Sequence, residues 1–277
     1  TGATATTATT EAPPTTGTVP VTVTTTTTTT VPQPEGDVTA DGTWTVMVYG
    51  LGDNNLEDAL LGDLLEMREV TASAPELTFL ALVDRSDEWT AEELDGIGDW
   101  TSAKLLEISN GQITELADWG ERNLGESGVL DEFLTAAAAA AAPSDHYALV
   151  FWDHGSMTGV GPDDSAGDVL EGWEIATGLE SGLMTSGIEL DLIGFDACLM
   201  ASLEVVSVVA PYATYMIASE ELEPNEGWDY SGFGFLAGDG GTVVDLGESI
   251  LNAYLPTSGP TDPTVTLSML DLREYGD

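Results

Sequence analysis

Short apolar runs alternate with helically spaced segments from Trp44 onward, and this alternation most constrains the fold. The runs that predict strands are 44–50, 77–84, 147–152, 188–195, 215–218 and 264–270, and those that predict helices are 54–70, 116–124, 129–142, 173–184 and 243–254. Residues 100–109 alternate loosely and predict a hairpin arm outside the main sheet. Strands separated by helices predict right-handed crossovers and a mostly parallel sheet covered on both faces. We therefore expect an α/β fold with three layers, α/β/α.

Residues 1–40 differ in composition from the rest of the chain. They are Thr, Pro and Ala with almost no large apolar side chains. Such a tract buries too little surface to offset its ordering entropy, so we expect a disordered Thr/Pro-rich linker or stalk followed by one folded domain over residues 41–277. The chain ends at Asp277 just after a predicted strand, which leaves open that further sequence follows. Thr/Pro tracts are typical of exported proteins, so a secreted or cell-surface tethered protein is favoured over a tail without a role.

The charge balance excludes two classes of partner. The chain has 49 Asp and Glu against 5 Lys and Arg, a formal net charge of -44. Such a polyanion repels nucleic acid and anionic lipid. The acids are scattered along the chain, which favours a solvated, halophilic surface for high salt over a surface that attracts cationic substrates. No apolar run reaches the roughly 18 residues of a membrane span, and one cysteine excludes an internal disulfide.

The only cysteine, Cys198, lies where a predicted strand gives way to helical spacing. Residues 188–195 form the apolar run, and helical spacing begins at Leu199. We expect Cys198 at the carboxyl end of a strand and near the amino end of a helix, where backbone N–H groups and the helix dipole stabilise a thiolate. A buried structural cysteine is the alternative for Cys198 alone.

His154 follows the predicted strand 147–152 in the same way. Carboxyl ends of neighbouring parallel strands lie about 5 Å apart, so this position predicts an imidazole beside the thiol. Such an imidazole lowers the thiol pKa and supplies a proton to a leaving amine. Gly155 lets a backbone N–H approach a substrate closely, and with the N–H of Cys198 it would form an oxyanion hole.

Four segments together resemble the clostripain family of cysteine peptidases, which are relatives of caspases, gingipains and legumain. The segments are 44–57, 147–155, 193–200 and 217–230, and the resemblance runs from about Trp44 to Leu272. It implies a caspase-like α/β/α sandwich over residues 41–277. It also implies a cysteine endopeptidase in which Cys198 is the nucleophile, His154 is its acid/base partner, and an acyl-enzyme forms.

The resemblance further implies specificity for Arg or Lys at the cleavage site of protein or peptide substrates. The family's acid at the base of the primary specificity pocket corresponds to Asp196, and a second acid falls on Glu226 or, less securely, Glu223. A buried unpaired carboxylate is costly, and a substrate cation relieves that cost. The alternative for Asp196 is the N-cap of the helix after Cys198.

Two points concern activation and cofactors. Relatives often cut themselves after a basic residue between the His and Cys strands, but residues 123–272 contain no Lys or Arg, so we do not expect this route. Some family members depend on calcium, and the acidic loop 163–168 could bind it without the spacing of an EF-hand. We expect no required cofactor and no structural zinc site, with calcium left open.

The leading hypothesis is an exported cysteine endopeptidase that cleaves after Arg or Lys. One alternative is a catalytically silent surface binding or structural module on the same scaffold. A third is a calcium-loaded carbohydrate or matrix binder, which only the acid count supports.

Overall fold

The computed structural model describes residues 36–238, 240–258 and 265–275. Contacts divide the chain into Thr1–Thr30 and Val31–Asp277, and the first unit lies outside the described residues. The predicted stalk is therefore described only over residues 36–40. There, the Val38 carbonyl accepts the Val243 N–H at 2.8 Å, and the Ala40 N–H donates to Gly241 at 2.9 Å. The folded part thus reaches back to Val38, a few residues before the predicted start at 41.

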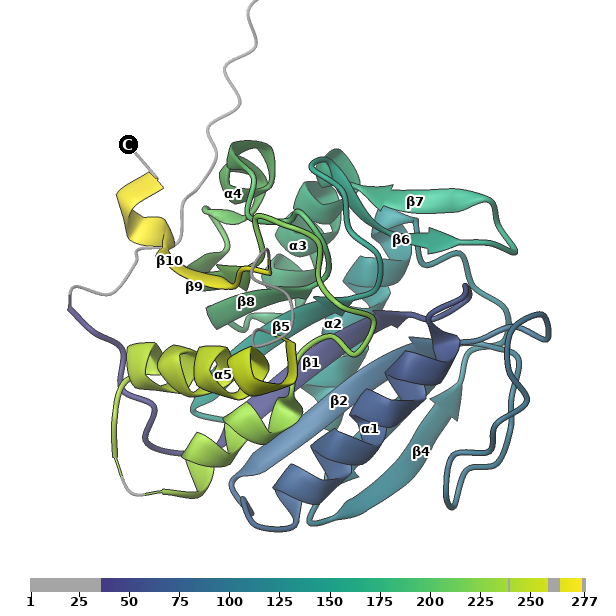
Figure 1. The fold of residues 1–277 in the computed structure, drawn as a ribbon, viewed down its shortest axis with the longest axis horizontal. Coiled ribbons are helices and arrows are strands. Elements are labelled where there is room, and N and C mark those ends of the chain that lie inside the picture. Colours follow the sequence, from purple (N-terminus) through teal and green to yellow (C-terminus); the bar gives the residue numbers. More distant parts are fainter. Residues whose placement is uncertain (1–35, 239, 259–264, 276–277) are drawn as a thin grey trace, which may run out of the picture. The chain divides into compact units, whose positions relative to one another are not determined.

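The described residues contain an eight-stranded sheet in the order β10-β9-β8-β5-β1-β2-β3-β4 (Figure 1). The strands are β1 (Trp44–Leu51), β2 (Leu77–Asp84), β3 (Lys104–Ser109), β4 (Gln112–Asp118), β5 (His146–Trp152), β8 (Leu190–Asp196), β9 (Ala213–Ala218) and β10 (Ser268–Asp271). The five central strands β9, β8, β5, β1 and β2 are parallel, and antiparallel strands flank them on both sides. A separate hairpin joins β6 (Gly159–Asp163) and β7 (Asp168–Glu171).

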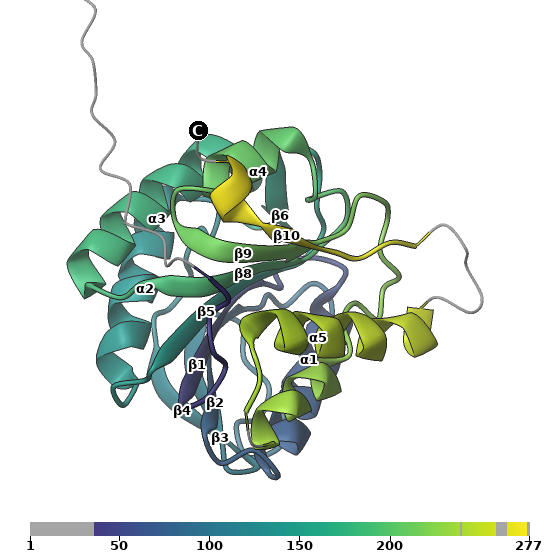
Figure 2. The same cartoon turned by 90° about the vertical axis from the view of Figure 1, so that its left-hand side faces the viewer.

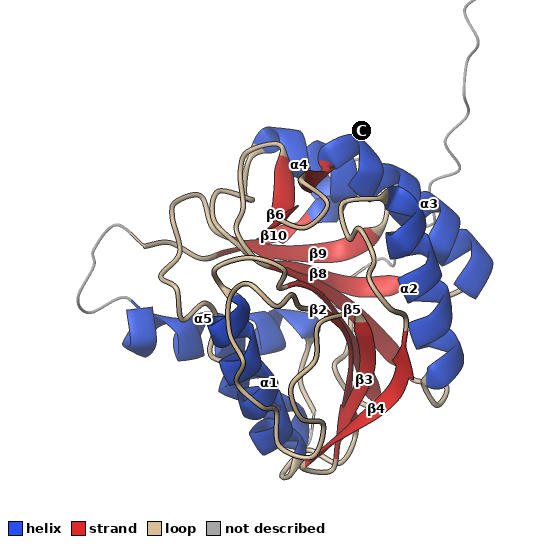
Figure 3. Cartoon of the chain, turned by 90° about the vertical axis from the view of Figure 1, so that its right-hand side faces the viewer, coloured by secondary structure: helices blue, strands red, loops and turns tan. Residues whose placement is uncertain are grey.

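Helices cover both faces of the sheet (Figures 2 and 3). One face packs against α1 (Glu57–Thr71), the 3₁₀ helix η1 (Tyr230–Ala237) and α5 (Val243–Ser258). The other packs against α2 (Ser127–Ala140), α3 (Gly172–Ser186) and α4 (Leu203–Val209), and the 3₁₀ helix η2 (Leu272–Tyr275) follows β10. Every residue of β1 is buried because alternate side chains enter the two cores. The predicted three-layer α/β fold is confirmed.

The edge beyond β2 differs from the prediction. Residues 104–109 do not form an arm outside the sheet, because β3 pairs antiparallel with β2. The predicted helix over 116–124 is also wrong, since β4 occupies residues 112–118. Asn110 and Gly111 both have positive φ, at 52° and 73°, which is the two-residue turn that Asn-Gly favours between antiparallel strands. β4 is an exposed edge strand, and it carries too few apolar side chains for the alternation that predicts a strand to be recognised in the sequence.

The segment after Cys198 also differs from the prediction. Helix α4 begins only at Leu203, and its N-cap is Ser202, whose side chain accepts the Val205 N–H at 3.2 Å. Leu199 adopts a left-handed conformation with φ 61°, which turns the chain away from helical geometry directly after the cysteine. Cys198 therefore does not lie at a helix N-terminus, and Asp196 is not a helix N-cap.

Candidate active site

The two candidate catalytic residues follow neighbouring strands. β5 and β8 run parallel, and their register pairs Trp152 with Asp196. The pairing continues one residue further, because the Asp153 N–H donates to the Asp196 carbonyl at 3.2 Å. His154 therefore lies level with the residues that follow Asp196, among them Cys198.

Both residues line one small cavity at this edge of the sheet, with a volume of about 50 Å³. Its lining consists of Leu56, Trp152, Asp153, His154, Asp196, Ala197, Cys198, Glu223, Pro224, Asn225 and Gly227. The lining comes from the start of α1, from the ends of β5 and β8, and from the loop after β9. A thiol, an imidazole and the three carboxyl groups of Asp153, Asp196 and Glu223 thus share one concave site.

The loop after β9 holds the cysteine sulfur. Cys198 is partly buried, and its Sγ accepts the Glu223 N–H at 3.2 Å. The same sulfur lies 3.8 Å from the Glu223 carbonyl oxygen. This amide thus contacts the sulfur where the sequence predicted a helix terminus.

An asparagine that the sequence analysis did not single out contacts the histidine. His154 Nε2 lies 3.1 Å from Asn55 Oδ1. Because an amide oxygen only accepts hydrogen bonds, this contact places a proton on Nε2 and leaves Nδ1 as the acceptor. Partial burial lowers the pKa of His154, against the opposing effect of Asp164, so the neutral imidazole predominates at neutral pH.

The loop that carries Asn55 is anchored by its neighbour. Asn54 Nδ2 donates to Asp153 Oδ2 at 2.6 Å, to the Leu51 carbonyl at 2.8 Å and to the Pro162 carbonyl at 3.0 Å. Asn54 and Asp153 are both buried. These bonds join the ends of β1 and β5 and so fix where Asn55 meets the imidazole. The only sequence signal for this role is the polar segment that directly follows the first strand.

Gly155 packs against the backbone of Cys198. A Cβ built on Gly155 would lie 2.1 Å from the Cys198 carbonyl oxygen and 2.9 Å from its nitrogen. No other residue type fits there without moving the cysteine. The backbone of Gly155 thus lies against that of Cys198, and the oxyanion hole formed by their N–H groups stays a prediction.

Asp196 lines the cavity and is itself buried, with 4% of its surface exposed. Its Oδ1 accepts the Trp228 N–H at 3.0 Å, and its Oδ2 accepts the Tyr230 hydroxyl at 3.1 Å. Burial raises the pKa of Asp196 to about 7, although these two hydrogen bonds oppose the rise. Asp63 interacts electrostatically with Asp196, and the pKa of Asp63 is raised mainly by burial and then by Asp196.

Of the two alternatives for the second acid, the structure brings Glu223 to the cavity and not Glu226. Both carboxylate oxygens of Glu223 are buried and have no hydrogen-bond partner among the described residues. Burial, and then the charge of Asp196, raise the pKa of Glu223. Glu226 is exposed and does not line the cavity. The reason is a turn closed by the Gly227 N–H and the Pro224 carbonyl at 3.0 Å, which turns Glu226 toward solvent.

Carboxylates of the acidic loop 163–168 accept hydrogen bonds from within the loop and from residues 123 and 124. Asp163 accepts the backbone N–H groups of Ala166 at 2.8 Å and Leu124 at 3.1 Å. Asp168 Oδ2 accepts Asn123 Nδ2 at 2.8 Å. These bonds hold the carboxylates of Asp163 and Asp168 against donors of the protein itself.

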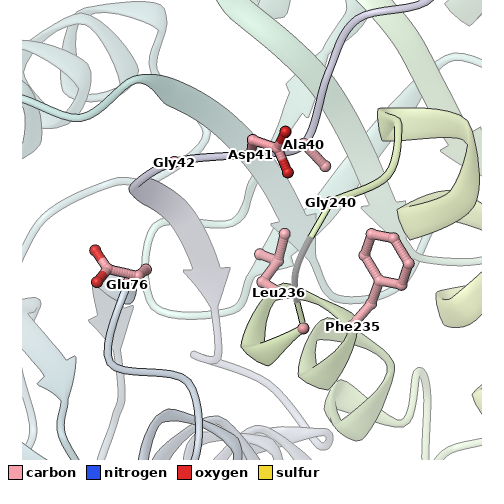
Figure 4. A pocket seen from close by; sticks show the side chains of 8 residues that line it. Ala40, Asp41, Gly42, Glu76, Phe235, Leu236 and Gly240 are labelled. Atoms are coloured by element: carbon pink, nitrogen blue, oxygen red, sulfur yellow. The ribbon is translucent and has the colours of Figure 1, made fainter.

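A second, larger cavity of about 510 Å³ lies at the amino ends of β1 and β2 (Figure 4). It is lined by Ala40, Asp41, Gly42, Glu76, Phe235, Leu236, Gly238 and Gly240. Asp41 and Glu76 are its ionisable residues, and this lining contains no nucleophile. Chemistry is therefore assigned to the smaller cavity at the opposite edge.

Comparison with known proteins agrees with this assignment. The sequence pattern of the clostripain family, peptidase family C11, matches residues 48–276. The chain belongs to the clostripain family.

Clostripain from Hathewaya histolytica is 29% identical to this clostripain-family chain over 213 residues. The match covers 67% of this chain and 40% of clostripain, so the chain spans less than half the length of that relative. The activity and the substrates of this chain are therefore proposals.

Solved structures of clostripain-family proteins share the fold. A secreted C11 cysteine protease from Bacteroides thetaiotaomicron, in complex with an irreversible peptide inhibitor, has a TM-score of 0.67 and 24% identity over 84% of this chain and 67% of that protein. An inactive zymogen C11 protease from Parabacteroides distasonis has a TM-score of 0.62 and 20% identity over 83% of this chain and 62% of that protein. At these identities the likeness shows the fold.

No helix within the described ranges is both long and apolar enough to cross a bilayer.

Proposed function

We propose that this protein is a cysteine endopeptidase that cleaves peptide bonds after Arg or Lys. One observation carries the proposal: Cys198 and His154 share a cavity that the buried carboxyl groups of Asp196 and Glu223 also line. No Lys or Arg lines that cavity. Family membership supports the peptidase class, and the acidic pocket supports a cationic side chain before the scissile bond.

The proposed reaction begins with proton transfer from the Cys198 thiol to His154 Nδ1, while Nε2–H donates to Asn55. The sulfur attacks the substrate carbonyl carbon, and the backbone N–H groups of Cys198 and Gly155 donate to the oxyanion. His154 then gives its proton to the leaving amine, which breaks the peptide bond and leaves a thioester on Cys198. Water attacks the thioester with His154 as base, and this step releases the acid and restores the thiol.

Selectivity would come from the charge of the acid pair. Burial raises the pKa of both carboxyl groups, so each holds a proton more tightly here than in water. A bound guanidinium or ammonium pairs with the ionised carboxylates and displaces that proton. A neutral or acidic substrate side chain would leave the negative charge of the two carboxylates without a counter-charge. Asp196 supplies most of the discrimination, and Glu223 adjusts Arg against Lys.

The loop after β9 must move when substrate binds. The cavity of about 50 Å³ is smaller than the roughly 300 Å³ at which ligand sites begin. Glu223 contacts Cys198 directly, and Pro224 and Asn225 close the same cavity. We expect this loop to withdraw from the sulfur as the basic side chain enters.

Fluorogenic peptides with Arg, Lys or Asp before the scissile bond test the proposal, at low and multi-molar salt, with Cys198→Ala as control. We expect cleavage of the Arg and Lys peptides alone, lost in the variant. No cleavage under any condition would favour the silent binding module. Equal rates for basic and acidic peptides would remove the role of Asp196.

We also propose that the protein is exported and works at high ionic strength. The Thr/Pro-rich composition of residues 1–40 and the net charge of -44 support this location.

A further inference from the structure

Three large apolar side chains are exposed on segments that lead away from the catalytic residues. Met157 lies in the turn after His154, and Leu203 is the first residue of α4, in the segment after Cys198. Trp173 lies in the first turn of α3, directly after the β6–β7 hairpin. Met157 is 61% exposed, Trp173 is 62% exposed and Leu203 is 69% exposed. None of the three lines the cavity around Cys198, so they lie outside the site already described.

Two hydrogen bonds join the backbone segments that carry these side chains. Ser202 Oγ donates to the Met157 carbonyl at 3.1 Å, which ties the start of α4 to the turn after His154. The Gly172 N–H donates to the Thr158 carbonyl at 2.8 Å, which ties the start of α3 to the same turn. The three exposed side chains therefore lie on one surface, which we call the apolar patch: Met157, Trp173 and Leu203.

The turn that carries Met157 is closed by hydrogen bonds of its own. The Ser156 N–H donates to the Gly159 carbonyl at 2.9 Å, and Ser156 Oγ donates to the same carbonyl at 3.0 Å. The Gly159 N–H in turn donates to Ser156 Oγ at 3.1 Å. The turn also follows Gly155 directly, whose backbone packs against that of Cys198. The backbone at Met157 is therefore held at a fixed place relative to the sulfur.

The apolar patch and the acids of the cavity lie toward opposite faces of the sheet. Asp196 accepts hydrogen bonds from Trp228 and Tyr230, whose side chains belong to the core beneath α1 and α5. Helices α3 and α4, which carry Trp173 and Leu203, cover the other face (Figure 3). The sulfur and the imidazole lie at the edge of the sheet between these two faces. A peptide whose basic side chain enters the cavity would therefore run across the sulfur toward the patch.

We propose that the apolar patch binds apolar substrate side chains at the first two positions after the scissile bond. The inference rests on the proposed function and names the substrate more closely, as peptides in which apolar residues follow Arg or Lys. Large apolar side chains that gather on an exposed surface mark a binding site, and this patch adjoins the candidate catalytic residues. Binding there would remove apolar surface of both partners from water.

Acids at the border of the patch add a charge preference. Glu204 directly follows Leu203 and is exposed. Glu171 is also exposed, and its Oε2 accepts the Trp173 Nε1–H at 2.6 Å. These carboxylates repel an acidic side chain after the scissile bond. The order of preference at these positions should therefore be apolar, then small and polar, then acidic.

Internally quenched peptides test the proposal on the full chain. All carry Arg before the scissile bond, and the two residues after it are both Leu, both Ser, both Lys or both Glu. We expect kcat/KM about tenfold higher with Leu than with Ser, and lowest with Glu. Equal rates with Leu and Ser, or the highest rate with Lys, would refute the apolar patch as a substrate site.

A peptide arginyl methyl ester serves as the reference substrate, because its leaving group is methanol and reaches no residue of the patch. Hydrolysis of the ester together with equal rates for the Leu and Ser peptides would overturn the patch alone. Absence of hydrolysis of the ester and of all four peptides would overturn the proposed function, and this inference with it.

Variants locate the preference on the patch. We expect the Leu-to-Ser ratio of kcat/KM to fall at least about threefold in Met157→Ser and in Leu203→Ser. Because the ratio is taken within one variant, a loss of folded enzyme does not change it. Met184→Ser is the matched control, since Met184 is exposed on the same helix as Trp173 but about 16 Å further along it.

An unchanged ratio in both patch variants, or an equal fall in Met184→Ser, would contradict the proposal. Sedimentation velocity tests the other occupant, a second copy of the chain. We expect the parent chain and Leu203→Ser to sediment alike. A dimer of the parent chain that Leu203→Ser dissociates would assign the patch to self-association and overturn its role in substrate binding.

Discussion

At the residue scale, the proposed chemistry depends on which atoms are held next to Cys198 and His154. The sequence could place both residues, because each directly follows an apolar run whose strand type was clear. It could not identify Asn55 as the histidine's partner, and it preferred Glu226 where the structure brings Glu223 to the cavity. Both outcomes depend on loop geometry: Asn55 is positioned by the bonds of Asn54, and the turn ending at Gly227 directs Glu226 to solvent.

Asn55→Ala removes the acceptor for His154 Nε2–H. We predict that kcat toward an Arg peptide falls about tenfold with KM unchanged, because one hydrogen bond that orients the base is lost. Asn55→Asp keeps an acceptor and adds a charge, so it should restore much of kcat and move the acidic limb of the pH–rate profile upward. Wild-type kcat in Asn55→Ala would show that Asn55 does not position the histidine.

Asp196→Asn should change how stability depends on pH. The pKa of Asp196 is about 7 in the folded protein against 3.8 when exposed, so between these values the folded state holds a proton that the unfolded state lacks. Stability of the parent chain therefore falls as pH rises through this window, whereas Asn has no proton to lose. Urea unfolding at pH 5 and pH 8 should show the variant gaining roughly 1–3 kcal/mol relative to the parent. Identical pH dependence in the two proteins would contradict the assignment.

At the element scale, the register of β5 and β8 makes the site. The apolar runs predicted these strands because they are buried on both faces, and the parallel arrangement followed from the helices between them. The exposed strand β4 and the late start of α4 were missed. Neither is set by an apolar pattern: β4 depends on the Asn110–Gly111 turn, and α4 is delayed by the left-handed Leu199.

Gly155→Ala tests how closely the ends of β5 and β8 approach. The new Cβ would lie 2.1 Å from the Cys198 carbonyl oxygen, so either Cys198 or the end of β5 must shift. We predict at least about a hundredfold loss of kcat/KM, because a displacement of 1 Å can cost that much. Gly128→Ala is the matched control, since its Cβ meets nothing within 4 Å and it lies in α2. Full activity in Gly155→Ala would contradict the geometry.

At the scale of the whole molecule, the apolar cores determine the fold, whereas the surface charge determines how stability responds to salt. The two apolar cores on either face of the sheet account for the fold, which the sequence could predict from its pattern alone. The acidic side chains that give the net charge of -44 repel one another across the surface, and composition alone predicts that repulsion.

Stability should therefore rise with salt. Between 0.1 and 1 M NaCl the screening length falls from about 10 Å to about 3 Å. We predict a Tm increase of roughly 5 °C or more over that range, measured with EDTA present so that divalent cations do not contribute. A Tm that stays level or falls would remove the proposed adaptation to high salt.

The central claim is tested most directly by locating the covalent adduct of a peptide that ends in an arginyl chloromethyl ketone. Intact mass and peptide mapping should find one adduct, on Cys198, formed much faster than with the matching aspartyl reagent and slowed in His154→Ala. Equal labelling by both reagents, or no arginyl adduct on a Cys198 that iodoacetamide alkylates, would contradict the account.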